Sequence, residues 1–188
     1  MARNRWKNKI ANIDHKRLVF IDESGVTTNM TRHYGRIRGG SRLVDSVPGG
    51  VWSVTSIVSS IRLDGSISAM TIKGPIDGDS FKTFVSRVLC PSLRRGDIVV
   101  MDNLPTHKSE EIKKMIKGAR AELWYLPPYS PDLNPIEKMW SKIKASMRKM
   151  KARTEKDLNR AISKSLKLVS ADDSVGWFES CGYGLMHS

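Results

Sequence analysis

The chain has 188 residues, 39% of them hydrophobic, which is enough for one domain with a buried core and argues against global disorder. No stretch approaches the roughly 20 apolar residues of a membrane span, and the first residues lack the apolar run of a signal peptide, so a cytoplasmic protein is expected. The formal net charge of +13 favours nucleic acid as the partner, rather than a membrane or a small-molecule substrate.

Residues 1–16 are rich in Arg and Lys and predict a basic arm or linker ahead of a single domain over 17–188. Five later segments show the apolar runs or the alternation typical of strands. They span residues 18–21, 51–59, 66–72, 98–101 and 122–126. Asp64-Gly65 predicts a hairpin between the second and third of these strands, whereas residues 23–50 predict a long loop.

Four segments carry apolar residues at helical spacing behind a capping residue. These helices are expected to begin at Asp79, Ser109, Pro135 and Thr154. Pro91 is expected to end the first of them, and residues 176–188 are expected to be irregular. Because the early strands form a hairpin and the later ones alternate with helices, the expected fold class is α/β. It consists of one mixed five-stranded sheet with helices on both faces and right-handed crossovers between its parallel strands.

Three acidic residues stand at the ends of apolar runs or at a helix start: Asp22 in "LVFIDES", Asp102 in "DIVVMDNLPTHK" and Glu137 in "SPDLNPIEKMW". If the strands before Asp22 and Asp102 are neighbours, both carboxylates lie at the edge of the sheet where ligands usually bind. Two such carboxylates repel each other, and a divalent cation removes that cost. Mg²⁺ prefers oxygen ligands and leaves room for substrate phosphates.

Each acid also has a structural interpretation. An Asp after a strand is often a turn residue. Glu137 follows Asn134 and Pro135, and this pattern is typical of a capping box. Against capping, Glu137 begins a stripe that continues through Ser141, Lys144 and Arg148, which suits a metal beside a phosphate backbone.

At these residues the chain resembles the DDE transposases, specifically the bacterial insertion-sequence enzymes related to the mariner superfamily. The segments "FIDESG", "MDNLPTHKS" and "LPPYSPDLNPIEKMWSKIK" match that family's three motifs in order, with 34 residues between Asp102 and Glu137. The resemblance runs from about Leu18 to the "CGYG" near the end. The family's N-terminal helix-turn-helix modules have no counterpart in this chain.

The resemblance implies a ribonuclease H-like fold and a site of two Mg²⁺ ions, replaceable by Mn²⁺, held by Asp22, Asp102 and Glu137. It implies cleavage of transposon ends and strand transfer into target DNA by attack of a 3′ hydroxyl. It further implies a homodimer on DNA and, for a bacterial protein, association with the nucleoid. Two alternatives stay open: a stand-alone ribonuclease H-like nuclease, and a non-catalytic DNA-binding remnant of a transposase.

Further polar and basic residues are candidates for DNA contact because they flank the acidic motifs or lie in the Arg-rich segment. They are Asn103, His107, Lys108, Arg36, Arg38, Lys138, Lys142, Lys144 and Arg148. Asp97 and Asp132 are interpreted as turn residues, and Trp140 as a core residue.

Overall fold

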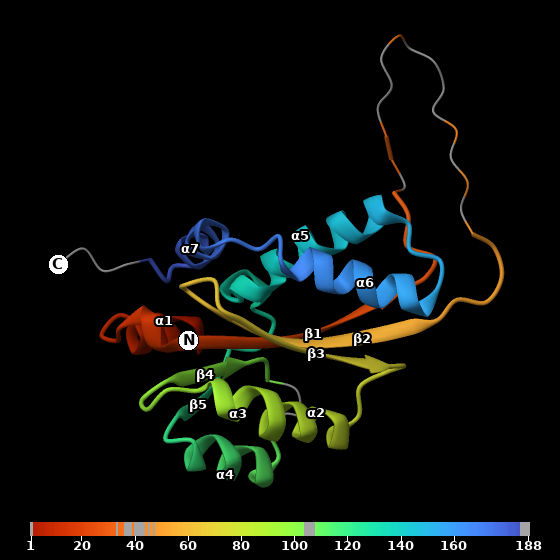
Figure 1. The fold of residues 1–188 in the computed structure, drawn as a ribbon. Helices are drawn as coiled ribbons and strands as arrows, with labels where there is room; N and C mark the ends of the chain where they lie inside the picture. The colour runs from red at the N-terminus through yellow and green to blue at the C-terminus, as the bar shows by residue number, and fades with distance from the viewer. Residues whose placement is uncertain are drawn as a thin grey trace.

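A computed structural model describes residues 2–32, 34–35, 39, 44, 46, 48–103 and 108–184. At its centre is a five-stranded sheet of order β3-β2-β1-β4-β5 (Figure 1). Strands β1, β2 and β3 pair antiparallel, whereas β4 pairs parallel with both β1 and β5. The strands are β1 (Leu18–Thr27), β2 (Val54–Arg62), β3 (Ile67–Lys73), β4 (Ile98–Met101) and β5 (Glu122–Tyr125). The expected mixed sheet is confirmed.

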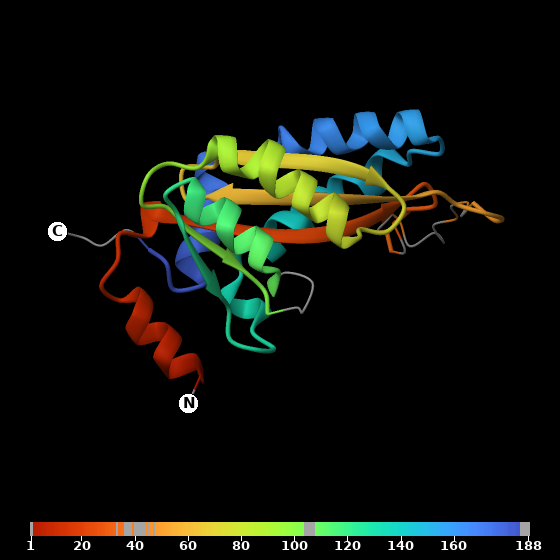
Figure 2. The same ribbon diagram turned by 90° about the horizontal axis from the view of Figure 1, so that it is seen from below.

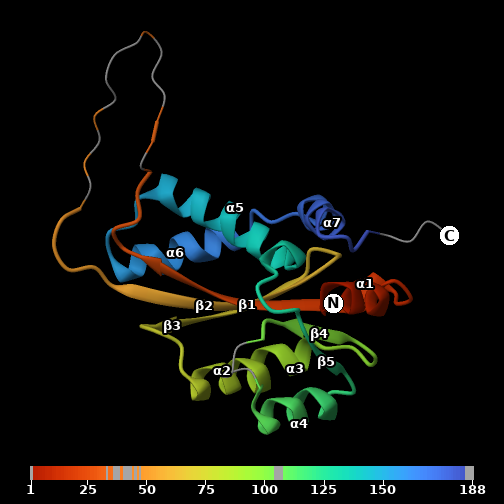
Figure 3. The same ribbon diagram turned by 180° about the vertical axis from the view of Figure 1, so that it is seen from behind.

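Helices cover both faces of the sheet. On one face lie α5 (Pro135–Met150), α6 (Glu155–Leu166) and α7 (Ala171–Ser180), as Figure 3 shows from behind. The other face carries α2 (Gly78–Phe84), a π-helical turn η2 (Val85–Leu89), α3 (Cys90–Ser92) and α4 (Glu110–Gly118), which lie in front of the strands in Figure 2. Strand alternation divides the core accordingly. Phe20 and Val100 pack with α5, and Ile21 and Met101 pack with α2 and α4.

Strand β1 is longer than predicted. Its apolar run ends at Ile21, but its pairing with β2 continues to Thr27 opposite Val54. Burial alternates in this extension, with Ser24 and Val26 buried and Gly25 between them exposed. The residue types do not show this alternation, because one of the buried residues is a serine, and the sequence therefore predicts a loop here. The prediction failed because the strand is defined by its partner β2 more than by its own composition.

Helix α2, the first helix on the face that also carries α4, differs from prediction at both ends. Its cap is Asp77, whose side chain accepts a hydrogen bond from the backbone N–H of Ser80 at 2.8 Å, rather than Asp79. Pro91 does not end the helical segment, which continues to Ser92. The ring is tolerated because Pro91 lies in the first turn of α3, where its missing N–H is not needed.

Two terminal segments are more ordered than the sequence suggested. The basic segment expected to be an arm or linker contains a helix, α1 (Ala2–Ile10), whose Trp6 and Ile10 are buried in the core, followed by the short 3-10 helix η1 (His15–Arg17). The tail expected to be irregular contains the second half of α7, which begins with a capping box between Ser170 and Asp173.

A chain of buried hydrogen bonds joins these two ends to the turn that precedes α5. The indole Nε1 of Trp6 donates to the Tyr183 hydroxyl at 3.0 Å, and that hydroxyl donates to the carbonyl of Leu133 at 2.7 Å. Leu133 ends a 3-10 turn, η4 (Pro131–Leu133), just ahead of α5. The start of α5 is therefore fixed by residues from both ends of the described chain.

Asp97, which was interpreted as a turn residue, is buried and paired with Arg62. Its Oδ2 lies 2.5 Å from the guanidinium, and both side chains are almost fully enclosed. The same oxygen accepts the backbone N–H of Arg94 at 2.6 Å. The pair connects β2 to the turn before β4. None of the described helices has the length and apolar character needed to cross a membrane.

Candidate active site

Asp22 and Asp102 stand at matched positions on neighbouring parallel strands. The last paired residues of β1 and β4 are Phe20 and Val100, and each carboxylate follows two residues later. Because side chains alternate along a strand, Asp22 and Asp102 fall on the same face as Phe20 and Val100, which is the face covered by α5. Glu23, the rival acid next to Asp22, falls on the opposite face by the same alternation.

Helix α5 brings Glu137 to this edge from its first turn. The capping interpretation of Glu137 does not fit, because Asn134 makes no side-chain cap bond. A capping box would also place the Glu137 carboxylate on the backbone N–H of Asn134, and that N–H donates instead to the carbonyl of Pro131 at 3.0 Å. The exposed Glu137 carboxylate is therefore available to the pocket.

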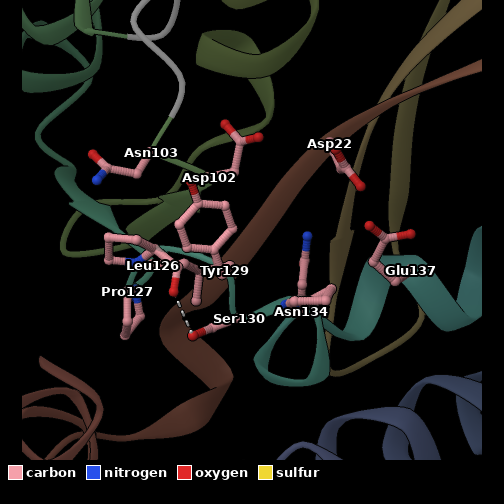
Figure 4. Close-up of a pocket in the computed structure, with 11 residues that line it drawn as sticks. Asp22, Asp102, Asn103, Leu126, Pro127, Tyr129, Ser130, Asn134 and Glu137 are labelled. Atoms are coloured by element: carbon pink, nitrogen blue, oxygen red, sulfur yellow. Dashed lines mark hydrogen bonds between the residues drawn. The ribbon is translucent and has the colours of Figure 1, made fainter.

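The three carboxylates line one pocket of about 450 Å³. Its other wall is the Pro-rich loop after β5, and the residues around it are Asp22, Asp102, Asn103, Leu126, Pro127, Pro128, Tyr129, Ser130, Pro131, Asn134 and Glu137. Figure 4 shows the carboxylates of Asp22 and Glu137 turned toward each other, with Asp102 across the opening, directly after the end of β4. Tyr129 is fully exposed and has a left-handed backbone, with φ of 53°.

Two hydrogen bonds orient Asp22. Its Oδ1 accepts the backbone N–H of Glu23 at 2.8 Å, and its Oδ2 accepts the indole N–H of Trp140 at 3.2 Å. Trp140 lies one turn after Glu137 on α5 and is also part of the core. From the sequence, only its core role is predicted. Its position three residues after Glu137 was the available sign that both residues point toward one strand.

Burial raises the pKa of the Asp22 carboxyl to about 7. The negative charges of Glu137 and Asp102 act in the same direction, and the hydrogen bonds from Glu23 and Trp140 oppose them. A proton therefore competes for Asp22 near neutral pH. A cation in the pocket would relieve both the burial and the repulsion.

The donor set suits a hard divalent cation, because it consists of three carboxylates around one polar opening. Within the described ranges, no three acidic, His or Cys side chains are already arranged to enclose an ion. Closing around a cation would thus require the side chains of this pocket to turn inward. The pocket is wide enough for such rotation, and it leaves space for oxygen atoms of a substrate.

The remaining predicted residues differ in their exposure and in whether they line this pocket. Asn103 is exposed and lines it, and Lys108 is exposed. On α5, Lys138 is exposed, Lys144 and Arg148 are partly buried, and Lys142 forms an ion pair with Asp173 of α7. Arg36, Arg38 and His107 lie outside the described residues.

Residues 17–159 match the family described as DDE superfamily endonuclease. The chain belongs to the DDE superfamily of endonucleases. Two curated relatives of this DDE chain are transposases of Caenorhabditis briggsae. The Tcb2 transposase is 36% identical over 58 residues, which make up 31% of this chain and 21% of that protein. The Tcb1 transposase is 29% identical over 85 residues, or 43% of this chain and 31% of that protein.

Solved structures of the Mos1 mariner transposase share the fold. The pre-cleavage Mos1 transpososome matches 100% of the DDE chain and 62% of its own chain with a TM-score of 0.70 at 15% identity. The isolated Mos1 catalytic domain matches 96% of the DDE chain and 87% of its own with a TM-score of 0.56 at 14% identity. The expected ribonuclease H-like architecture is confirmed. The DDE chain spans less than a third of each curated relative.

Proposed function

We propose that this DDE chain is the catalytic domain of a transposase, a divalent-metal-dependent DNA endonuclease and strand transferase. The observation that carries the proposal is the meeting of Asp22, Asp102 and Glu137, from β1, the end of β4 and α5, in one pocket of a chain with net charge +13. The transposase relatives from C. briggsae support the same function. Mos1 structures described as complexes with Mg and with Mn support a divalent metal.

In this proposal the three carboxylates are the metal ligands. Two Mg²⁺ ions, or Mn²⁺ in their place, would supply Lewis-acid stabilisation of the attacking and leaving oxygens when bound. The residues of the chain do the rest. Asp22 is held in place by Trp140 and by the Glu23 N–H, Glu137 is positioned by the start of α5, and the Pro-rich wall limits the water in the pocket. The reactions are cleavage at transposon ends and attack of the resulting 3′ hydroxyl on target DNA.

The test is metal-dependent cleavage of DNA by purified protein, with Asp102→Asn as the inactive variant and Asp172→Asn as the matched control. Asp172 is an exposed carboxylate in the first turn of α7, away from the pocket. We expect wild type and Asp172→Asn to nick DNA in Mg²⁺ or Mn²⁺, and Asp102→Asn to be inactive but folded. Cleavage by Asp102→Asn at the wild-type rate would reject the proposed site.

The substrate separates this proposal from its alternatives. Joining of a pre-cut 3′ end to a second duplex supports a transposase. Cleavage confined to RNA–DNA hybrids without joining would favour a ribonuclease H-like nuclease, and DNA binding without any metal-dependent cleavage would favour a remnant. A homodimer on DNA is part of the proposal, and sedimentation of the complex with end-containing DNA tests it.

We further propose that Lys138, Lys144 and Arg148 of α5 contact DNA phosphates, together with Asn103 and Lys108. Lys142 is a weaker candidate, because its ion pair with Asp173 already engages its ammonium group. Each lost phosphate contact should reduce the slope of log affinity against log salt by about 0.9. Arg148→Ala should show this change. Lys117→Ala, on α4 across the sheet, is the matched control and should not.

A further inference from the structure

Asn134 occupies the N-cap position of α5 without acting as a cap. Its backbone is extended, with φ of −110° and ψ of 100°, yet its side chain accepts no hydrogen bond from the first turn. The cap residues of α4, α6 and α7 do: Ser109, Thr154 and Ser170 each accept a backbone N–H of their own helix. The usual reason for an Asn at this position therefore does not apply here.

One atom of the Asn134 side chain also lacks the partner that a buried amide normally has. Asn134 is only 4% exposed. Among the described residues, its Oδ1 is one of the few buried polar atoms with no hydrogen-bond partner. Buried amides are nearly always satisfied. Because Oδ1 is an acceptor, a phosphate oxygen cannot supply its missing bond, and the unpartnered oxygen indicates instead that no contact to Oδ1 holds the amide in its place.

The place of the amide indicates which group its NH₂ could bind. Asn134 lines the same pocket as the three carboxylates. Figure 4 shows its amide nitrogen turned toward the opening between Asp22 and Glu137. The carboxylates can only accept hydrogen bonds when ionised, so they cannot hold a phosphate oxygen directly. The amide NH₂ of Asn134 is a neutral donor at the same opening.

We propose that Asn134 is a substrate-contacting residue whose Nδ2 donates a hydrogen bond to a non-bridging oxygen of the DNA phosphate that enters this pocket. The proposal rests on the proposed function, because it requires DNA as the substrate. It adds a fourth catalytic residue to the three carboxylates and gives it a different task, which is to fix the phosphate rather than a cation. If the amide were reversed, Oδ1 would face the opening and bind a cation. The experiment separates phosphate binding through Nδ2 from cation binding through Oδ1.

The experiment compares Asn134→Ala and Asn134→Asp with wild type. Asn134→Asp keeps the shape but replaces the donor with an acceptor, and it serves if the Ala variant does not fold. Three quantities are measured: the single-turnover rate of DNA cleavage in Mn²⁺, affinity for a short duplex in Ca²⁺, and affinity for Mn²⁺ without DNA. Thermal unfolding provides the readout for a purely structural role.

We expect both variants to cleave more slowly, on the order of 100-fold, as for the loss of one donor that stabilises developing charge. Duplex affinity should fall as well, and more in Asn134→Asp because its added charge repels the phosphate. Mn²⁺ affinity of Asn134→Ala should stay within about threefold of wild type, because in this proposal the amide donates to the phosphate and does not bind the cation. The thermal midpoint of Asn134→Ala should not fall, because Asn134 makes no cap bond and its Oδ1 has no hydrogen bond to lose.

Three results would overturn the proposal. Unchanged cleavage and duplex affinity in both variants would remove Asn134 from the site. Mn²⁺ affinity that drops in Asn134→Ala and recovers in Asn134→Asp would assign the residue to the cation. A marked loss of thermal stability with proportionate loss of all activities would give it a structural role. A wild-type protein that neither binds nor cleaves DNA would instead reject the proposed function, and with it the substrate on which this inference depends.

Discussion

The indole Nε1 of Trp140 donates a hydrogen bond to Oδ2 of Asp22 at 3.2 Å, and so joins α5 to β1 at the candidate active site. The same helix presents Glu137 one turn earlier. The hydrogen bond favours the charged form of Asp22 and lowers the pKa of that carboxyl, against the larger effect of burial.

Replacing Trp140 with Phe should weaken metal binding even though the core is preserved. The variant keeps an aromatic ring in the core but loses the donor, so the pKa of Asp22 rises further and the proton competes better with a cation. We expect Mn²⁺ affinity at pH 7 to fall about three- to tenfold, the equivalent of one modest hydrogen bond. Calorimetric titration measures it. Trp177→Phe, on α7 and away from the pocket, is the control, and an equal loss there would contradict the role of the indole N–H.

Asp22 should make the metal-free protein less stable as pH rises from about 4 to about 7. Its pKa is about 7 in the folded chain against an ordinary value of 3.8, so in this range the folded state binds more protons than the unfolded state. The stabilising contribution is complete below the ordinary pKa and is lost as pH rises toward 7, by a few kcal/mol at about 1.4 kcal/mol per pKa unit. Denaturant unfolding in EDTA, with Asp22→Asn subtracted, measures it.

Saturating Mg²⁺ should remove that loss, because a bound cation favours the ionised carboxylate. Metal affinity should in turn rise with pH until about 7 and then level off, as the competing proton leaves Asp22. A wild-type stability that matches Asp22→Asn at every pH would show that Asp22 does not titrate in this range.

Breaking the buried pair between Arg62 and Asp97 should destabilise the fold strongly. Asp97→Asn leaves the guanidinium charge of Arg62 enclosed without its partner, and such losses cost about 3–5 kcal/mol. Asp64→Asn is the matched control, because the Asp64 pair with Arg94 is solvent-exposed, at 3.7 Å, and should contribute less than about 1 kcal/mol. Urea denaturation compares the two, and similar losses would contradict the prediction.

Removing the Tyr183 hydroxyl should loosen both the N-terminal helix and the turn before α5. Tyr183→Phe deprives the Trp6 indole of its acceptor and the Leu133 carbonyl of its donor, at a cost of about 1–3 kcal/mol. Amide hydrogen exchange should become faster in α1. Tyr129→Phe, whose ring is fully exposed, should leave the unfolding free energy unchanged.

The parts of the fold that could be predicted are those whose signal is local. The apolar run at 98–101 gave β4 without error, and the Ser109 cap gave the start of α4. Parallel pairing of the strands before Asp22 and Asp102 followed from the order of the elements. That pairing was sufficient to predict that the two residues lie at the same edge of the sheet, where both line one pocket.

The parts that could not be predicted depend on distant partners. The docking of α1 needs Tyr183, which is 177 residues away from Trp6. Asp97 looked like a turn residue because its partner Arg62 lies 35 residues earlier on another strand. Asn134 matched a local cap pattern, and only the geometry of α5 shows that its side chain faces the pocket instead. A pattern of residue types limits the local structures that a segment can adopt, whereas its neighbours in the fold determine which of these structures forms.

Because β1 and β4 differ in length, the backbone environments of Asp22 and Asp102 differ. Asp22 lies within a ladder and faces Ser59 of β2, whereas Asp102 follows the last residue of β4. The main chain at Asp22 is therefore preorganised by its pairing with β2. A cation that enters the pocket should meet at Asp22 a carboxylate whose backbone needs no rearrangement.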